Sequence, residues 1–307
     1  MNEAQRAVFQ GIPYYYHEEQ VNCRYQLTLK DPVDPALLQQ ALDTSRPLAG
    51  WYFQKVVWER RQASLMPNDA PCRVWVGSAE PNIPEETDGY LFSLHCEGKT
   101  IYFDWFHFLA DGRGFSPFMT LVLMEYCNLR YGTAFVCEAL AEDPPFDPEE
   151  LLAEFPESQA PGNLKTEAVD ISCGTPKRLR LRLSRKSVIE WAKQEQVKPF
   201  SVLLGLICQA SRDYLGKEQL IYSYPADLRG MLGLPNARYN CIATYQLPLK
   251  LAAQDRLRDF VQKLDAEVRD SLRPERLRFR MAEQMGFVCR VFQQKAPLKI
   301  QKRIFQM

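Results

Sequence analysis

The sequence predicts a mixed α/β protein (α/β to α+β class) made of two lobes, and three observations support that prediction. The 307 residues are enough for two domain-sized units. Strand-like and helix-like patterns alternate in both halves of the chain. Between the halves, residues 138–174 are rich in proline and acidic residues, which is typical of a solvated linker. We therefore expect an N-terminal lobe over residues 1–137 and a C-terminal lobe over residues 175–307.

The N-terminal lobe is expected to contain a sheet and two helices. Runs rich in aromatic and β-branched residues predict strands at Cys23–Lys30, Trp51–Arg60, Arg73–Val76, Tyr90–Cys96 and Thr100–Phe106. Asp34 and Pro35 are typical of an N-cap and a first helical residue, and Pro47 ends the helix that they begin. The run Thr100–Phe106 is apolar on both faces apart from Asp104, which is typical of a strand inside a sheet. The loop His107–Gly112 follows it, and a second helix is predicted after the loop, over Phe115–Tyr131.

The C-terminal lobe repeats this alternation. Strands are predicted at Arg178–Leu183, Leu220–Tyr224 and Asn240–Leu249, and helices at Ser187–Gln196, Phe200–Leu215, Gln254–Leu272 and Arg276–Val291. In the helix over Phe200–Leu215, apolar residues recur at helical spacing. We expect this stripe to face the core, and it consists of Val202, Leu203, Leu206, Ile207 and Ala210.

Composition excludes several classes of function. The 38 basic and 38 acidic residues cancel, so the overall charge that draws proteins to nucleic acid is missing. The first twenty residues lack the pattern of a secretory signal, and no apolar run is long enough to span a bilayer. The nine cysteines form no C-x-x-C pair, which argues against a zinc site and a disulfide framework. We expect a cytoplasmic protein with reduced thiols and no bound metal.

His107 is the main candidate for chemistry. It follows the apolar run that ends at Phe106, and Asp111 and Gly112 come four and five residues later. Histidine titrates near neutral pH, so modest tuning makes it a base for a hydroxyl, amine or thiol. Gly112 permits a close turn into the helix, and Asp111 near the helix start can pair with a distant arginine. The alternative reading is a packed core histidine followed by an ordinary helix cap.

This H-x-x-x-D-G pattern, between a buried strand and a helix, resembles the signature of the chloramphenicol-acetyltransferase-like superfamily, which includes peptide-synthetase condensation domains and alcohol acetyltransferases. The segment Tyr224–Arg229 resembles the Asp-Leu-Arg segment of the family's second lobe. Asn240 stands where the family often has an asparagine. The resemblance covers Cys23 to Asp270 and implies two lobes of this fold, each a mixed sheet with flanking helices.

The resemblance implies transfer of an acyl group from a thioester to a hydroxyl or amine. His107 is the implied general base, Asp111 and Gly112 orient its loop, and Arg229 is the candidate partner of Asp111. Arg113 is the alternative partner, and Asp227 and Asn240 are candidates to line a tunnel between the lobes. No permanently bound cofactor is implied. Acyl-coenzyme A or acyl-pantetheine is the expected co-substrate, and a carrier protein is a further candidate partner.

Two departures from the family pattern refine these expectations. Condensation domains usually carry two adjacent histidines, whereas Phe106 precedes His107 here, which favours hydroxyl acceptors and ester formation. The chain ends at Met307, before the strands that close the second lobe in larger relatives, so we expect an incomplete second lobe. That expectation motivates a second hypothesis from another class, a non-catalytic module that binds a partner or a pantetheine arm.

Overall fold

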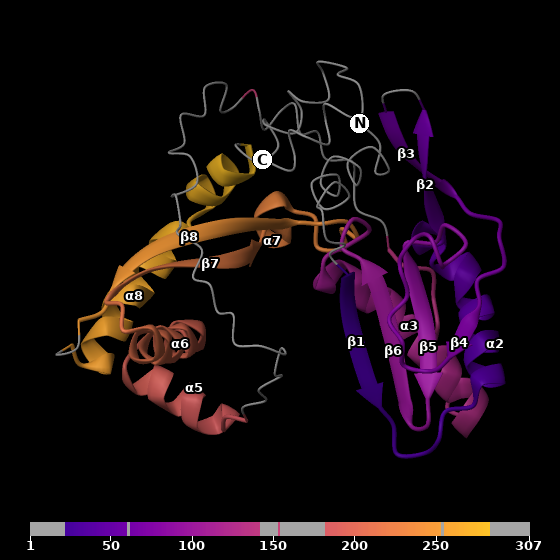
Figure 1. Cartoon of the computed structure of the whole chain (residues 1–307), viewed down its shortest axis with the longest axis horizontal. Coiled ribbons are helices and arrows are strands. Elements are labelled where there is room, and N and C mark those ends of the chain that lie inside the picture. Colours follow the sequence, from indigo (N-terminus) through magenta and orange to yellow (C-terminus); the bar gives the residue numbers. More distant parts are fainter. Residues whose placement is uncertain (1–21, 60–61, 142–152, 154–181, 253–254, 283–307) are drawn as a thin grey trace. The chain divides into compact units, whose positions relative to one another are not determined.

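The computed structural model describes residues 22–59, 62–141, 153, 182–252 and 255–282 (Figure 1). These residues form two compact units. The first comprises 22–141 together with Asp227–Ile242, and the second comprises 182–226 and 243–281. Asp227–Ile242, which we expected in the C-terminal lobe, therefore belongs to the first unit. Most of the predicted linker over 138–174 lies outside the described residues, so its linker character stays a prediction.

The first unit contains a four-stranded sheet with the strand order β1-β6-β5-β4. Strand β6 (Thr100–Phe106) lies antiparallel to both β1 (Asn22–Thr28) and β5 (Phe92–Glu97), and the short β4 (Val74–Val76) runs parallel to β5. The strands predicted at Tyr90–Cys96 and Thr100–Phe106 thus pair as an antiparallel hairpin. The predicted strand at Trp51–Arg60 begins later, because Gly50–Tyr52 forms a 3₁₀ turn. Strand β2 (Gln54–Glu59) then pairs with β3 (Gln62–Pro67), which the sequence did not predict.

Two helices pack beside this sheet. Helix α2 (Pro35–Ser45) is capped by the side chain of Asp34, as predicted, which accepts hydrogen bonds from the amides of Ala36 and Leu37. Helix α3 (Gly112–Tyr131) ends at Gly132, which has the left-handed conformation that favours glycine (φ 63°). Stacking of the Trp105 and Phe115 rings, 4.4 Å between centroids, joins β6 to α3 in a largely aromatic core.

The second unit contains a long two-stranded ribbon and helices that pack beside it. Strands β7 (Gln219–Asp227) and β8 (Ile242–Lys250) pair with each other. The last residue of β7, Asp227, and the first residue of β8, Ile242, are counted with the first unit. Between them, the short α7 (Arg229–Leu232) lies in the first unit. The second unit contains the helices α5 (Arg185–Gln194), α6 (Pro199–Leu215) and α8 (Leu257–Ser271). Residues 274–281 are helical as well, where the sequence predicted a helix. The predicted strand over Arg178–Leu183 lies outside the described residues except for its last two positions.

Helix α6 presents a different face to the core from the one predicted. Its buried residues are Ser201, Val202, Leu204, Gly205 and Cys208, so only Val202 of the predicted stripe is buried. Small residues on α6 explain why this other face of the helix is buried. At Gly205 a Cβ atom would lie 2.4 Å from a methyl group of Val261, so glycine is needed for this close approach of α8. The Ser201 hydroxyl also donates to the buried Asp265 of α8. Close helix packing and a buried hydrogen bond therefore outweigh the apolar pattern.

Candidate functional site

His107 lies in a tight turn at the end of β6. The amide of Leu109 donates to the carbonyl of Phe106 (2.9 Å), and the indole of Trp105 donates to the carbonyl of Ala110 (2.9 Å). The residues on either side of His107, Phe106 and Phe108, are buried, while His107 itself is half-buried. The turn is therefore anchored in the core by its neighbours, and the imidazole stands at its edge.

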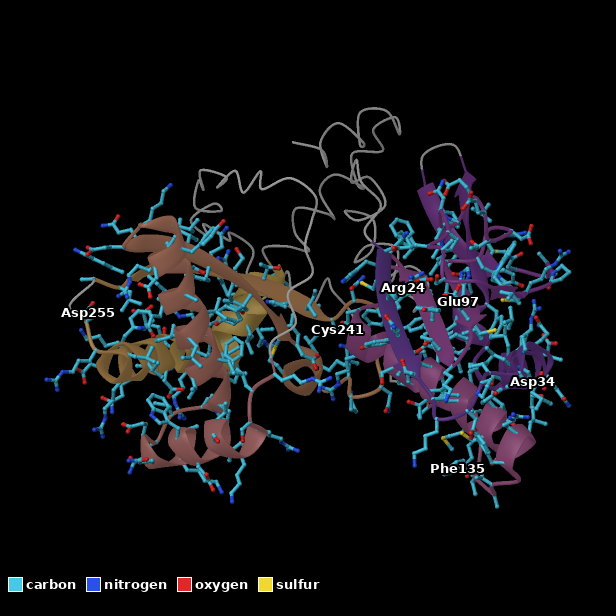
Figure 2. The ribbon with its side chains drawn as sticks, turned by 60° about the horizontal axis from the view of Figure 1, so that its bottom comes forward. Arg24, Asp34, Glu97, Phe135, Cys241 and Asp255 are labelled. Atoms are coloured by element: carbon cyan, nitrogen blue, oxygen red, sulfur yellow. The ribbon has the colours of Figure 1, made fainter. Side chains whose placement is uncertain are left out.

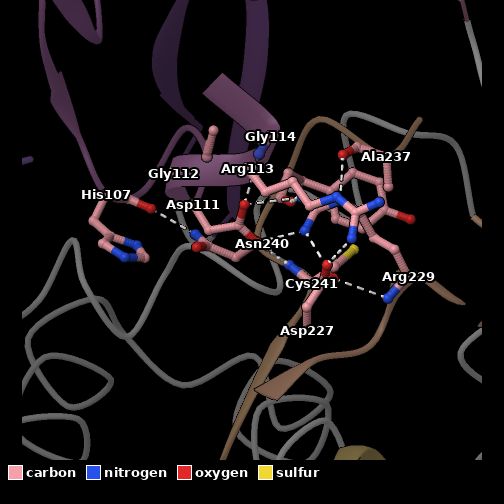
Figure 3. A network of polar contacts seen from close by, with 12 residues as sticks. His107, Asp111, Gly112, Arg113, Gly114, Asp227, Arg229, Ala237, Asn240 and Cys241 are labelled. Atoms are coloured by element: carbon pink, nitrogen blue, oxygen red, sulfur yellow. Dashed lines mark hydrogen bonds and ion pairs between the residues drawn. The ribbon is translucent and has the colours of Figure 1, made fainter. Parts of the chain in front are cut away.

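The His107 imidazole is partly desolvated. Burial lowers its pKa below the ordinary value and outweighs three influences that raise it: a hydrogen bond with its own backbone carbonyl, the charge of Asp111 and the side chain of Asn240. The same carbonyl accepts a hydrogen bond from Asn240 Nδ2 at 2.5 Å (Figure 3). At neutral pH the ring is therefore predominantly neutral, the form that accepts a proton.

Asp111 does not point at the imidazole as a relay but joins two distant segments. Its carboxylate caps α3 by accepting from the amide of Gly114 at 2.7 Å. It also accepts from both terminal nitrogens of Arg229, at 2.9 and 3.0 Å, and from the amide of Cys241 at 2.9 Å. A carboxylate with four donors fixes the start of α3 against the segment that contains Asn240.

Arg229 is almost fully buried, with 1% of its surface exposed, and all three of its guanidinium nitrogens have partners. Besides Asp111, it donates to the carbonyls of Ala237 and Tyr239, each at 2.8 Å, and to Asp227 at 3.2 Å. Of the two arginines that the sequence offered as partners of Asp111, the structure therefore has Arg229. The other, Arg113, is mostly exposed and pairs with Asp227.

The network also explains why Asp227–Ile242 belongs to the first unit. Arg229 enters the core beside Asp111, and its carbonyl partners fold the chain back so that Asn240 reaches the carbonyl of His107 (Figure 3). Burying an arginine side chain costs folding free energy unless each of its N–H donors has an acceptor. The loop that supplies the carbonyls of Ala237 and Tyr239 therefore packs around the Arg229 guanidinium in the first unit. Asp227 and Asn240, expected to line a tunnel, are members of this network. Their predicted tunnel-lining role stays a prediction.

Residues that the sequence did not single out complete the site. The hydroxyl of Tyr25 donates to the carbonyl of Gly112 at 3.1 Å, and that of Tyr52 donates to the carbonyl of Gly114 at 2.5 Å. A Cβ atom at Gly114 would lie 2.1 Å from the backbone oxygen of Arg238 and 2.9 Å from Arg229. The Gly-x-Gly spacing after Asp111 was the available signal for this close approach. Both tyrosines lie too far away in the sequence to be associated with the motif.

A second polar cluster lies on the sheet of the first unit. Asp104 on β6 is fully buried and binds Arg24 of β1, labelled in Figure 2, at 2.6 and 2.8 Å. His95 Nε2 lies 2.8 Å from the hydroxyl of Ser93 and 3.8 Å from Asp104. A Ser-His-Asp relay uses both ring nitrogens, whereas here one nitrogen faces both partners. This cluster therefore has the composition of a triad without its geometry.

An open pocket of about 550 Å³ in the first unit borders the Arg113 end of the network. Its walls are one stripe of α3, the segment 136–141 and the turn 235–238. Within the described part of the chain, no group of three or more His, Cys, Asp or Glu side chains is arranged to hold a metal ion. The seven cysteines described there are free thiols. None of the described helices is long and apolar enough to cross a membrane.

Comparison with known proteins identifies the fold. The structure of polyketide synthase associated protein 5 from Mycobacterium tuberculosis is similar with a TM-score of 0.65 and 17% identity, over 88% of this chain and 73% of that one. The structure of F. sporotrichioides TRI101, complexed with coenzyme A and T-2, is similar with a TM-score of 0.57 and 15% identity, over 92% of this chain and 75% of that one. The first condensation domain of the calcium-dependent antibiotic synthetase, in complex with a substrate analogue, is similar with a TM-score of 0.59 and 16% identity, over 89% of this chain and 72% of that one.

The chain therefore has the mixed α/β fold of the chloramphenicol-acetyltransferase-like proteins, as the sequence predicted. No protein-family model matches its sequence, and no curated protein does. At these identities the likeness extends to the fold alone. Function must be argued from the residues around His107.

Proposed function

We propose that this protein is an acyltransferase that moves an acyl group from a thioester, coenzyme A or a carrier-protein pantetheine, to a hydroxyl acceptor. The observation that carries the proposal is the half-buried His107, whose carbonyl is held by Asn240 while Asp111 and Arg229 fix the segments on either side. A neutral imidazole fixed in position at the edge of the core is suited to general-base catalysis.

The proposed reaction needs only one proton carrier. In this proposal the neutral ring carries its proton on Nδ1, which leaves Nε2 as the base. Nε2 removes the proton of the acceptor hydroxyl as its oxygen attacks the thioester carbonyl. The tetrahedral intermediate then collapses, the carbon–sulfur bond breaks, and the imidazolium returns the proton to the departing thiolate. An ester and a free thiol result, and His107 is neutral again.

The remaining residues act on position in this proposal and not on the reacting atoms. Asn240 restrains the His107 carbonyl, and through it the orientation of the ring. Asp111 and Arg229 hold the Asn240 segment against the start of α3. Phe106, in the place of a second histidine, favours hydroxyl over amine acceptors. TRI101, with coenzyme A, supports a thioester donor, since it shares the fold.

His107→Ala tests the proposal directly. General-base assistance contributes roughly 10²–10⁴-fold, so thiol release from acyl-coenzyme A with a panel of alcohols should fall by about that factor. Donor binding, measured calorimetrically with coenzyme A, should change little. His95→Ala is the matched control, because that histidine lies in the other cluster. Undiminished thiol release by His107→Ala would remove the histidine from the mechanism. A folded wild type that is inactive with every donor and acceptor would favour the non-catalytic binding module.

The pH profile gives an independent readout. Because burial lowers the pKa of His107, the neutral base persists below the ordinary histidine value of about 6.5. We expect kcat/KM to be constant above that pH and to fall only in more acidic solution. Asn240→Ala should shift the pH at which kcat/KM falls. If Asn240 served stability alone, the substitution would lower the fraction of folded protein and leave that pH unchanged. A wild-type limb above about pH 7 would contradict the assigned base.

A further inference from the structure

The side-chain amide of Asn240 has one bonded end and one unbonded end. Its nitrogen, Nδ2, donates to the carbonyl of His107 at 2.5 Å. Its oxygen, Oδ1, is buried and accepts no hydrogen bond of ordinary geometry from the described residues, although Asn240 is only 2% exposed. A buried amide oxygen without a donor costs folding free energy, so such an atom in a native protein needs a reason.

The surroundings of Asn240 fix which end of the amide is which. If the amide were turned over, Oδ1 would face the carbonyl oxygen of His107, and two acceptors would oppose each other. The next residue is held as well, because the amide of Cys241 donates to Asp111 at 2.9 Å. The position of Oδ1 beside His107 is therefore set by the backbone on which Asn240 stands.

The electrostatics of His107 indicate what Oδ1 acts on. Burial is the largest influence on the pKa of His107 and lowers it, whereas the side chain of Asn240 raises it. Only a hydrogen-bond acceptor favours the charged, doubly protonated ring, since a donor favours the neutral ring. The atom of Asn240 that acts on the imidazole is therefore Oδ1. Figure 3 shows the Asn240 amide at the His107 carbonyl, and Nδ1 is the ring nitrogen nearer to the backbone.

We infer that Oδ1 of Asn240 accepts a hydrogen bond from Nδ1 of His107, and that this bond shortens when the ring becomes an imidazolium. The inference rests on the proposed function, in which Nε2 is the base, and it makes Asn240 a positioning residue. One amide then holds His107 at two points, the backbone carbonyl and the ring. An acceptor at Nδ1 keeps the proton of the neutral ring there and leaves Nε2 without one. Such contacts are often long without substrate and shorten during the reaction.

The charged groups near His107 leave this role to the amide. Asp111 is the carboxylate whose charge acts on the imidazole, and it too raises the pKa of His107. Its two oxygens already bind the guanidinium of Arg229, at 2.9 and 3.0 Å. A neutral amide oxygen orients the ring without the strong rise in pKa that a free carboxylate would cause. The base therefore stays deprotonated at neutral pH.

Heteronuclear NMR of the His107 ring nitrogens tests the inference without any substrate. The chain has three histidines, so the signals that disappear in His107→Ala assign this ring. In the wild type the neutral ring should carry its proton on Nδ1. Asn240→Ala should lower the pKa of His107 and the fraction of the Nδ1–H form, because the acceptor is gone. Asn240→Asp keeps an acceptor oxygen and adds a charge, so it should raise the pKa instead.

Asn68→Ala is the matched control. Asn68 is also 2% exposed, but both ends of its amide are bonded elsewhere, Nδ2 to the carbonyl of Asp88 and Oδ1 to the amide of Ala70. Its loss should lower the melting temperature and leave the His107 ring unchanged. In steady-state kinetics, Asn240→Ala should lower kcat roughly 10–100-fold with little change in KM for the donor. Asn240→Leu, which nearly keeps the side-chain volume, replaces Asn240→Ala if the latter does not fold.

Two results would overturn the inference. One is a folded Asn240→Ala whose His107 ring keeps the pKa and the proton position of the wild type. The other is a wild-type neutral ring that carries its proton on Nε2. An inactive wild type whose ring responds to Asn240→Ala as expected would instead support the hydrogen bond and remove the acyltransferase proposal, so the two failures are distinguishable.

Discussion

Asp111 in the first unit and Asp265 in the second are both buried aspartates that join segments far apart in the chain, yet their cationic partners differ. Asp111 binds Arg229, whose side chain is 1% exposed. Asp265 accepts from the hydroxyl of Ser201 at 2.6 Å and the amide of Lys198 at 2.8 Å, while its cation, Arg269, is half exposed. Removal of Asp265 thus leaves behind Arg269, which water can solvate. Removal of Asp111 leaves behind Arg229, which is buried away from water. The cost of losing an ion pair depends on the partner that remains.

The largest effect is expected for Asp111→Ala. Breaking a buried pair by removing one partner typically costs about 3–5 kcal/mol, because the other charge stays buried. Urea unfolding should show a loss of this size, with activity falling in parallel. Combining Asp111→Ala with Arg229→Met should recover part of the stability, since no cation then remains buried. A single variant within about 1 kcal/mol of wild type would contradict this reading of the network.

Asp265→Ala should cost less, about 1–3 kcal/mol, because it leaves the Ser201 hydroxyl and the Lys198 amide without their acceptor. Burial raises the pKa of Asp265, but hydrogen bonds from Ser201, Arg269 and the Lys198 amide outweigh it and hold the pKa below the ordinary value. The stabilisation is therefore complete above about pH 4 and is lost as the pH falls below it. Unfolding at neutral pH and at about pH 3 should show the difference between variant and wild type shrinking in acid. An equal difference at both values would mean that the carboxylate charge is irrelevant.

Arg113→Ala should change the unfolding free energy least, and it serves as the control for Asp111→Ala in the first unit. Its pair with Asp227 joins the same two segments as the buried pair, but the Arg113 side chain is 62% exposed. Exposed ion pairs contribute about 0–1 kcal/mol, so the unfolding free energy should scarcely change, and the change should vanish at high salt. A loss comparable to that of Asp111→Ala would show that exposure does not separate these pairs.

Much of the first unit could be predicted from the sequence because its signals are local. Asp34 and Pro35 begin α2, and the apolar run before His107 is a central strand, β6. Glycine and proline punctuation, capping and strand periodicity act over a few residues. Strand β3 was missed because its pairing with β2, and not its own composition, makes it a strand.

In the candidate site, too, the residues with a local sequence signal were predicted and the contacts between distant residues were not. His107, Asp111 and Gly112 share one short segment, and the resemblance supplied Arg229 and Asn240. The sequence left open whether Arg113 or Arg229 pairs with Asp111, and the contacts of Tyr25 and Tyr52 had no sequence signal at all.

The sequence by itself determined most strands and helices of the first unit, the position of the histidine loop and the balance of charge, because these depend on neighbouring residues and composition. Only the tertiary structure decided which arginine satisfies Asp111, which unit contains Asp227–Ile242 and which face of α6 is buried. The reason is common to all three. Each is a choice between locally equivalent options, and close packing or the satisfaction of a buried charge by residues distant in the chain makes the choice.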